Sequence, residues 1–382
     1  MSTSKSKLFI VTLFFLWCTH AFPQDFDLQG QLSGWITVNV DELSESQTGV
    51  RYIPGLSVGK PISKDFSLDV EISFNVYGSG QFHGSDNMET NGKIKPYRLW
   101  LRFTSSRFEA RLGLQKINFG SATLLRPLMW FDRIDPRDPL QLTDGVYGLL
   151  VRYYFLNNVN VWLWGLYGNK DLKGWELLET EKRRLETGGR LQVPLFSGEI
   201  AFTYHHRQVD LRKQTFAALL SSEDSVPEDR FGLDGKWDIG IGVWFEGVLI
   251  HRNIDIPQMK YQKLINVGLD YTFGLGNGLT VLHEYFVLET SEKTFSSGDG
   301  LSFSALSLSY PIGLLDRITG MVYYDWERED WYRFINFQRI LDHWTFYLIG
   351  FWNPDQFQIY QNRAENNLFA GKGFQLMVAL NH

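Results

Sequence analysis

The sequence has almost no cysteine, no long apolar run beyond its N-terminus and no excess of basic residues. Cys18 is the single cysteine among 382 residues, so neither an internal disulfide nor a thiolate-bound metal is needed or available. The formal net charge is −6, and such acidity argues against nucleic acid as a partner. Beyond the N-terminus, no apolar stretch reaches the roughly 18 residues that a transmembrane helix needs. A disulfide scaffold, a nucleic-acid-binding protein and a helical membrane protein are therefore disfavoured.

The N-terminal segment has the pattern of a secretory signal peptide. A lysine-bearing start precedes the apolar run from Leu8 to Trp17, and small residues follow at 19 and 21. We expect residues 1–21 to be removed, and the loss of two lysines then takes the net charge from −6 to −8. The mature chain, residues 22–382, is expected to be one domain. Lipidation of Cys18 is the less favoured alternative, because the bulky Trp17 precedes it.

What the sequence does have is aromatic residues, 15% of the chain, and alternation of apolar with polar side chains. From Phe66 to Val76 every second residue is apolar, while Asp69, Glu71 and Asn75 have the other parity. A β-strand with one apolar and one polar face gives this period of two. One such strand could belong to a soluble sheet, but the pattern recurs about eighteen times. The clearest strands are 28–40, 50–58, 66–76, 97–103, 108–115, 147–155, 185–193, 199–207, 231–238, 243–250, 264–273, 279–288, 302–310, 317–326, 332–340, 344–352 and 373–381.

The connections between these strands alternate between short and long, as the periplasmic turns and external loops of a membrane barrel do. The short connections include 61–65, 105–106, 157–158, 197–198, 274–278, 311–315 and 341–343. The long ones include 77–94, 116–145, 168–183, 209–229, 251–261, 289–300 and 353–371. The sequence therefore predicts an all-β fold, a transmembrane antiparallel up-and-down β-barrel of 16–18 strands. Such a barrel belongs in the outer membrane of a Gram-negative-type cell envelope, with outer-membrane lipids as partners.

Aromatic side chains gather near the predicted strand ends, which indicates the aromatic girdles of a membrane barrel. The residues concerned are Tyr153, Tyr154, Phe155, Trp162, Trp164, Tyr323, Tyr324, Trp326, Trp331 and Tyr332. Ordinary core packing is the alternative for all of them. Four tryptophans could instead stack on sugar rings inside a pore, namely Trp100, Trp130, Trp162 and Trp164.

The stretch from Arg111 to Gly145 combines a strand with an unusual loop. Its strand reads Arg111-Leu-Gly-Leu-Gln115, and its loop carries Phe119-Gly120 and then three prolines among closely spaced acids and arginines. This combination resembles the porin superfamily that includes alginate-export and phosphate-selective types, in which such a strand leads into a long inward loop. The resemblance implies an outer-membrane channel and says little about its solute.

Residues 116–145 form the third predicted external loop, after 41–49 and 77–94. The third loop is the one that folds into the lumen of general porins. Its prolines fix φ, and its acids can cap turns or pair with arginines. We expect the pore constriction to be formed by Arg126, Asp132, Arg133, Asp135, Arg137 and Asp138. Binding of a cation such as Ca²⁺ by these acids is the alternative, which the interleaved arginines disfavour.

Charged side chains occupy the polar parity of the strands that flank this loop. The predicted lumen wall contains Arg98, Arg102, Glu109, Arg111, Gln115, Arg152, Arg190 and Arg207, with Asp69, Glu71, Glu186 and Glu199 as further candidates. Rows of opposite charge across a narrow pore order water and penalise apolar solutes. The arginines near the loop favour anionic or sugar-like solutes, and structural ion pairs without a role in transport are the alternative.

We therefore expect a channel for diffusion of small hydrophilic solutes, without cofactor or bound metal, either alone or as a homo-oligomer. A lipid-modifying enzyme is one alternative, and it would need a Ser–His pair oriented by a third polar group. His83, Ser85 and Asp86 supply the residue types without the spacing, and adjacent His205 and His206 point to opposite faces. A structural or secretion-partner barrel is the other alternative.

The final predicted strand, from Lys372 to Val378, resembles the C-terminal signal that the barrel-assembly machinery recognises. The chain ends in Asn381-His382 rather than in an aromatic residue, which departs from that pattern. A plain edge strand is the alternative. The resemblance adds the barrel-assembly machinery to the expected partners.

Overall fold

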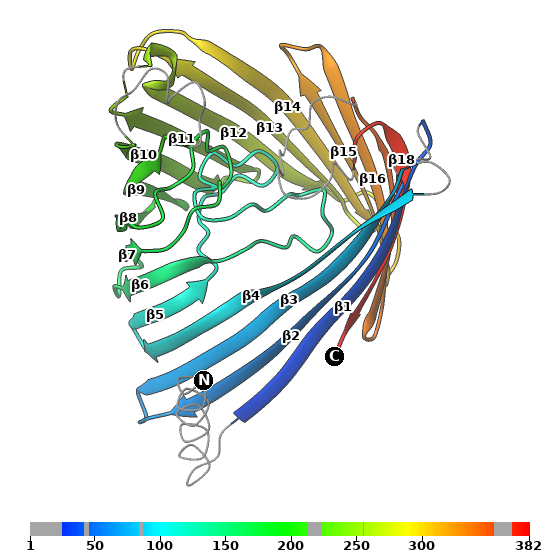
Figure 1. The fold of residues 1–382 in the computed structure, drawn as a ribbon, viewed down its shortest axis with the longest axis horizontal. Helices are drawn as coiled ribbons and strands as arrows, with labels where there is room; N and C mark the ends of the chain where they lie inside the picture. The colour runs from blue at the N-terminus through cyan, green and yellow to red at the C-terminus, as the bar shows by residue number, and fades with distance from the viewer. Residues whose placement is uncertain (1–24, 42–45, 84–86, 213–223, 255, 355–368) are drawn as a thin grey trace.

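The described residues form one closed antiparallel sheet of 18 strands (Figure 1). The computed structural model describes residues 25–382 except 42–45, 84–86, 213–223, 255 and 355–368. Each strand pairs with its neighbours in the chain, and β1 (Asp25–Asn39) also pairs with β18 (Lys372–Asn381), which closes the barrel. The predicted up-and-down β-barrel is confirmed, at the upper end of the predicted strand count.

The other strands follow one another around the barrel in chain order. They are β2 (Gln47–Pro61), β3 (Phe66–His83), β4 (Asn87–Ser105), β5 (Phe108–Gln115), β6 (Val146–Tyr154), β7 (Asn160–Leu166), β8 (Glu186–Leu195), β9 (Gly198–Asp210), β10 (Ser225–Asp238), β11 (Gly242–Arg252), β12 (Tyr261–Phe273), β13 (Leu279–Ser291), β14 (Asp299–Pro311), β15 (Asp316–Asp325), β16 (Asp330–Leu341) and β17 (Trp344–Trp352). A short 3₁₀ helix, η2 (Pro257–Met259), lies between β11 and β12. In the described part of the chain no helix is long and apolar enough to cross a membrane.

The period of two in the sequence gives the barrel an apolar outside and a polar inside. On β4 the outward Leu99 and Leu101 are 45% and 42% exposed, whereas the inward Arg98 is 8% exposed. Large apolar side chains are exposed along the outside of nearly every strand. Inward positions carry most of the buried charges, because the loops inside the barrel cover them.

Several predicted external loops are longer than the real ones. The predicted loop 77–94 is mostly strand, since β3 runs to His83 and β4 starts at Asn87. The predicted loops 209–229 and 289–300 are likewise shortened by the outer ends of β9, β10, β13 and β14. In these outer ends apolar and polar residues no longer alternate, but the backbones of neighbouring strands remain paired. A pattern of apolar residues cannot detect that extension.

The wall of the barrel is uneven, and the inward loops leave it where the strands are short. β3 and β4 contain 18 and 19 residues, but β5 contains 8 and β7 contains 7. The segments that follow β5 and β7 turn into the barrel, where Figure 1 shows them inside its outline in teal and green. We call residues 116–145 the first inward loop and residues 167–185 the second inward loop.

A β-bulge in β4 directs two side chains to the lumen. The register against β3 shifts between Ser73 and Phe74, so that Tyr97 is the extra residue. Bulges re-aim neighbouring side chains. Here Lys95 and Arg98, three residues apart, both contact the first inward loop.

The aromatic residues near the strand ends divide between two faces. Tyr153, Phe155, Trp326 and Trp331 lie on the outside, as a girdle requires. The girdle prediction is wrong for Trp162, Trp164, Tyr323 and Tyr332, which belong to the buried cluster inside the barrel or pack against it. They have the inward parity, where aromatic rings pack against the inward loops rather than lipid.

Candidate functional site

Two buried carboxylates, on β11 and β13, bind the first part of the first inward loop. Glu246 on β11 accepts hydrogen bonds from the N–H groups of Ala122 at 2.7 Å and Leu128 at 3.1 Å. Glu284 on β13 accepts three more from the consecutive N–H groups of residues 123–125, at 2.6, 3.1 and 2.7 Å. Both glutamates are fully buried. Hydrogen bonds contribute about 0.5–1.5 kcal/mol each, and more when the acceptor is charged, so these five bonds fasten the loop across the lumen.

Apolar packing reinforces this attachment. Phe119 lies with its ring centroid 5.9 Å from those of Trp164 on β7 and Phe131 of the same loop. Leu125 and Leu128 belong to the same buried cluster, which extends across to β16 and β17. The loop therefore has a core of its own inside the barrel.

Four of the six predicted constriction residues pair with one another inside the first inward loop. Arg126 binds both carboxylate oxygens of Asp132, at 3.0 and 3.3 Å, and both side chains are buried. Arg137 binds Asp135 in the same bidentate way, at 2.8–3.1 Å. These pairs brace the loop. Arg133 keeps a half-buried side chain, and its N–H donates to Thr143 at 2.8 Å.

Asp138, the sixth predicted constriction residue, shapes a turn. Its carboxylate accepts hydrogen bonds from the N–H groups of Leu140 at 3.0 Å and Leu142 at 3.3 Å. Burial raises the pKa of Asp138 to about 6 and outweighs these two bonds, which lower it. The ionised carboxylate is therefore held at a cost in free energy.

The last part of the loop contacts the opposite side of the barrel. Leu140 packs against a cluster that contains Trp35 of β1 and Tyr347 of β17. Asp144 pairs with Lys95 at 2.7 Å, and Arg98 donates to the carbonyl of Thr143 at 3.1 Å. The loop thus reaches the wall on both sides of the lumen.

On β4 to β7, arginines and tryptophans form a row on the lumen face, which we call the arginine–tryptophan row. It consists of Trp100, Arg102, Arg111, Arg152 and Trp162. Arg111 and Arg152 lie 4.7 and 3.9 Å from the ring centroids of Trp100 and Trp162. The exposed fractions of the Arg102, Arg111 and Arg152 side chains are 33%, 15% and 16%.

Two acids share the charge of this row. Glu109 lies 3.2 Å from Arg111 and 3.5 Å from Arg152, and Asp69 lies 3.1 Å from Arg102. Gln115 is buried and donates to two backbone carbonyls, so its task is structural.

Two of the predicted wall arginines, Arg190 and Arg207, are covered rather than exposed to the lumen. Arg190 binds Asp234 in a bidentate pair, at 2.6 and 2.8 Å, and is 4% exposed. Arg207 is 0% exposed. Neither can contact a solute in this arrangement, which fits the alternative of structural ion pairs. The second inward loop covers Arg207 on β9, whereas the ring of Phe119 of the first inward loop lies 5.1 Å from Arg190 on β8.

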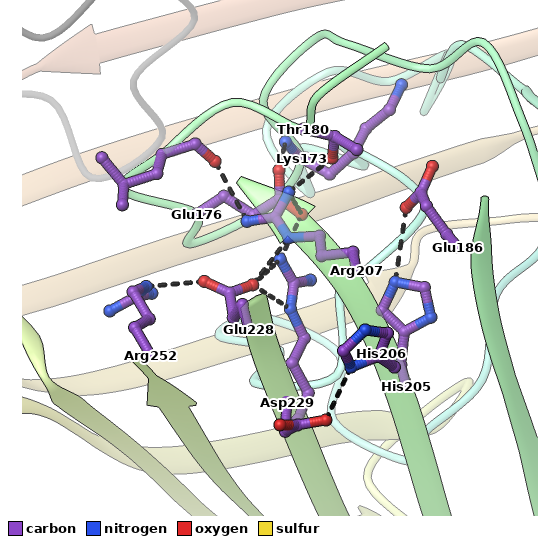
Figure 2. Close-up of polar contacts among 12 residues, drawn as sticks. Lys173, Glu176, Thr180, Glu186, His205, His206, Arg207, Glu228, Asp229 and Arg252 are labelled. Carbon is purple, nitrogen blue, oxygen red and sulfur yellow. Dashed lines mark hydrogen bonds and ion pairs between the residues drawn. The ribbon is translucent and has the colours of Figure 1, made fainter. Parts of the chain in front are cut away.

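Figure 2 shows a group of buried charged residues beneath the second inward loop. We call this group the arginine cluster. Glu228 on β10 accepts from Arg207 at 2.6 Å, Arg230 at 2.8 Å and Arg252 at 2.6 Å. Glu176, from the loop, lies 3.0 Å from Arg207 and 2.7 Å from Arg230. The predicted site residues did not include Glu176, Glu228, Arg230, Arg252, Glu246 or Glu284. Five of these residues lie in strands, where the alternation of apolar and polar residues indicates that their side chains point inward. No pattern in the sequence indicates which residues they contact.

His205 and His206 lie on opposite faces, as the alternation predicts. His205 is buried inside, where Nδ1 accepts from the Trp164 indole at 3.1 Å and Nε2 lies 3.4 Å from Glu186. His206 is on the outside and lies 2.8 Å from Asp229. The two rings cannot act on one substrate.

No family model and no curated protein matches this chain. Solved structures do match it over nearly its whole length. OccAB4 of Acinetobacter baumannii aligns at 9% identity and a TM-score of 0.56, covering 95% of this chain and 99% of that one. OccK7 (OpdD) of Pseudomonas aeruginosa gives 9% and 0.54 with the same coverage, and OmpF of Salmonella typhi, in complex with daunomycin, gives 10% and 0.51 over 94% and 97%. The chain has the fold of a Gram-negative outer-membrane porin.

The two alternative chemistries considered for this chain are a Ser–His enzyme site and a metal site. Of the candidate enzyme residues, His83 ends β3, whereas Ser85 and Asp86 lie outside the described residues, as does the predicted signal peptide, 1–21. Across the described ranges, no group of three or more His, Cys, Asp or Glu residues could hold a metal ion. The acids of the first inward loop instead contact arginines, a lysine and backbone N–H groups.

Proposed function

We propose that this protein is an outer-membrane channel for the diffusion of small hydrophilic solutes, constricted by the first inward loop. The observation that carries the proposal is a closed barrel with an apolar outer face and a charged inner face, across which Glu246 and Glu284 fasten a loop. An apolar band outside and polar residues inside are typical of barrels that conduct through their lumen.

Within the constriction, we assign two different tasks to the charged residues. Arg126, Asp132, Asp135 and Arg137 are buried or half-buried in pairs and keep the loop rigid. Arg133 is half-buried, and Asp144 keeps 45% of its side chain exposed beside Lys95. These last groups are the ones available to a passing solute.

The solutes that fit best are anions and saccharides. Partly exposed guanidinium groups of the arginine–tryptophan row can donate hydrogen bonds to carboxylate, phosphate or hydroxyl oxygens. Trp100 and Trp162 lie beside these groups and offer rings for stacking. Because Glu109 and Asp69 balance much of the charge, we expect a mild anion preference rather than strict selectivity.

Ion selectivity tests this assignment. Under a KCl gradient across a planar bilayer, the double variant Arg111→Ala and Arg152→Ala should lower the anion-to-cation permeability ratio by roughly two- to three-fold. Arg339→Ala is the matched control, because Arg339 pairs with Asp316 near a turn, with half of its side chain exposed. An unchanged ratio in the double variant would refute the anion preference and leave the channel proposal intact.

The same proposal includes the route to the membrane. The signal peptide at residues 1–21 would direct export, and the barrel-assembly machinery would insert the chain. β18 supports this route because it forms the closing strand with β1. Fractionation of expressing cells should recover the protein in the outer membrane, and recovery in the periplasm would contradict this route.

A further inference from the structure

We propose that the second inward loop positions the first one inside the lumen, with Trp175 and Glu176 as its positioning residues. The inference rests on the proposed channel function and adds a second element to the constriction. The second inward loop itself need not touch the solute. It acts through the backbone of the first inward loop.

The two loops are joined at the centre of the first one. The Trp175 indole N–H donates to the carbonyl of Arg126 at 3.1 Å, and the Gly174 N–H donates to the carbonyl of Asp132 at 3.3 Å. Arg126 and Asp132 are the residues whose side chains form the buried ion pair. The second loop therefore holds both ends of the brace that gives the first loop its shape.

Gly174 permits this close approach. Its φ is +41°, a conformation that favours glycine. A Cβ atom at this position would lie 2.2 Å from the carbonyl oxygen of Met129, which is backbone and cannot move aside cheaply. The backbones of the two loops are thus packed directly against each other.

The second loop is in turn fixed to the wall by ring stacking and hydrogen bonds. The Trp175 ring stacks on Phe286 of β13 with a centroid distance of 4.6 Å. The backbone carbonyl of Trp175 accepts a hydrogen bond from the Gln262 side chain of β12 at 3.0 Å. Arg207 donates to the Thr180 hydroxyl at 2.6 Å and to the Leu178 carbonyl at 3.0 Å.

The arginine cluster explains why this loop stays in place. The wall contributes three buried arginines and one carboxylate, Glu228, and the second carboxylate, Glu176, comes from the loop. If the loop stayed in place without the charge of Glu176, three buried guanidinium groups would share one carboxylate. Uncompensated buried charge is strongly unfavourable. Glu176 therefore makes the second inward loop a fixed brace rather than a lid.

Removing the charge of Glu176 tests the inference. In planar bilayers, Glu176→Gln should raise the single-channel conductance roughly two-fold and increase current fluctuations, because the first inward loop gains freedom at the constriction. Asp171→Asn is the matched control, since Asp171 is an exposed carboxylate of the same loop, outside the cluster. Equal, measurable conductance in Glu176→Gln, Asp171→Asn and the unmodified protein would overturn the proposal.

A second measurement does not depend on conduction. Hydrogen exchange followed by mass spectrometry should show residues 126–132 exchanging roughly ten-fold faster in Glu176→Gln than in Asp171→Asn, while the strands keep their protection. Trp175→Phe keeps the stack on Phe286 but removes the N–H donor, and should give a smaller increase. Exchange at 126–132 that is unaffected in both variants would refute the positioning role. A protein that shows the faster exchange but conducts no current would instead contradict the channel function alone.

Discussion

At the scale of single residues, the charges inside the barrel fall into two groups according to burial. Arg190, Arg207 and Arg252 are sealed under loops and hold structure together, whereas Arg102, Arg111 and Arg152 remain partly exposed on the lumen face. Breaking a buried pair leaves an unpaired charge and costs about 3–5 kcal/mol. Substitutions in the first group should therefore reduce stability, and substitutions in the second should change selectivity.

Asp138 should make stability depend on pH. Its pKa is raised from 3.8 to about 6, so between these values the folded loop keeps a proton that the unfolded chain has lost. Stability should therefore fall as pH rises through this window, by at most about 3 kcal/mol, and level off above it. In Asp138→Asn this contribution is absent. The melting temperature of the variant minus that of the unmodified protein should become more positive from pH 4 to pH 7.

Calorimetry at four or five pH values would measure this difference. Asp41→Asn provides the comparison, because Asp41 is an exposed carboxylate outside the inward loops, beside Lys372. A difference for Asp138→Asn that does not change with pH would show that the carboxylate ionises normally.

At the scale of elements, Glu284 should control the attachment of the first inward loop. In Glu284→Gln the amide nitrogen cannot accept a hydrogen bond, so at least one of the N–H groups of residues 123–125 loses its acceptor. A buried unpaired donor costs about 1–3 kcal/mol, so the loop should detach roughly ten-fold more often.

Maleimide labelling of a cysteine at Ala122, in a Cys18→Ser background, would report this detachment as a faster reaction. Glu289→Gln is the control, because Glu289 lies on the same strand and pairs with Lys263 at 2.8 Å, away from the loop. Equal labelling rates in the two variants would show that Glu284 does not anchor the loop.

The sequence could predict elements wherever one face of a strand is apolar and the other polar. From the alternation between Phe66 and Val76 it predicted a strand. From the order of the strands it predicted that residues 116–145 form the third external loop. It could not predict that Glu246 and Glu284 bind this loop, because those contacts join residues more than a hundred positions apart. For the same reason, the sequence predicts residues 168–183 only as an ordinary external loop. Its partners include Arg230 and Gln262, which are distant in sequence, and its backbone has no period.

At the scale of the whole molecule, the outer face should be in contact with lipid. Ile265, in the middle of β12, is 54% exposed on this face. An arginine facing the middle of a bilayer destabilises a barrel by about 2–4 kcal/mol. Urea unfolding in lipid vesicles should therefore show this loss for Ile265→Arg and almost none for Ile265→Leu. If Ile265→Arg were as stable as the unmodified protein, this face would not be embedded in a membrane.

The proposed function requires that solutes pass through the lumen beside the two inward loops. Single-channel recording of the purified, unmodified protein in a planar bilayer tests it most directly. We expect discrete, uniform current steps as single barrels insert, with a larger step for Glu284→Gln, whose first inward loop is loosened. Barrels that insert without any current, in both proteins, would contradict it and would identify a sealed structural barrel.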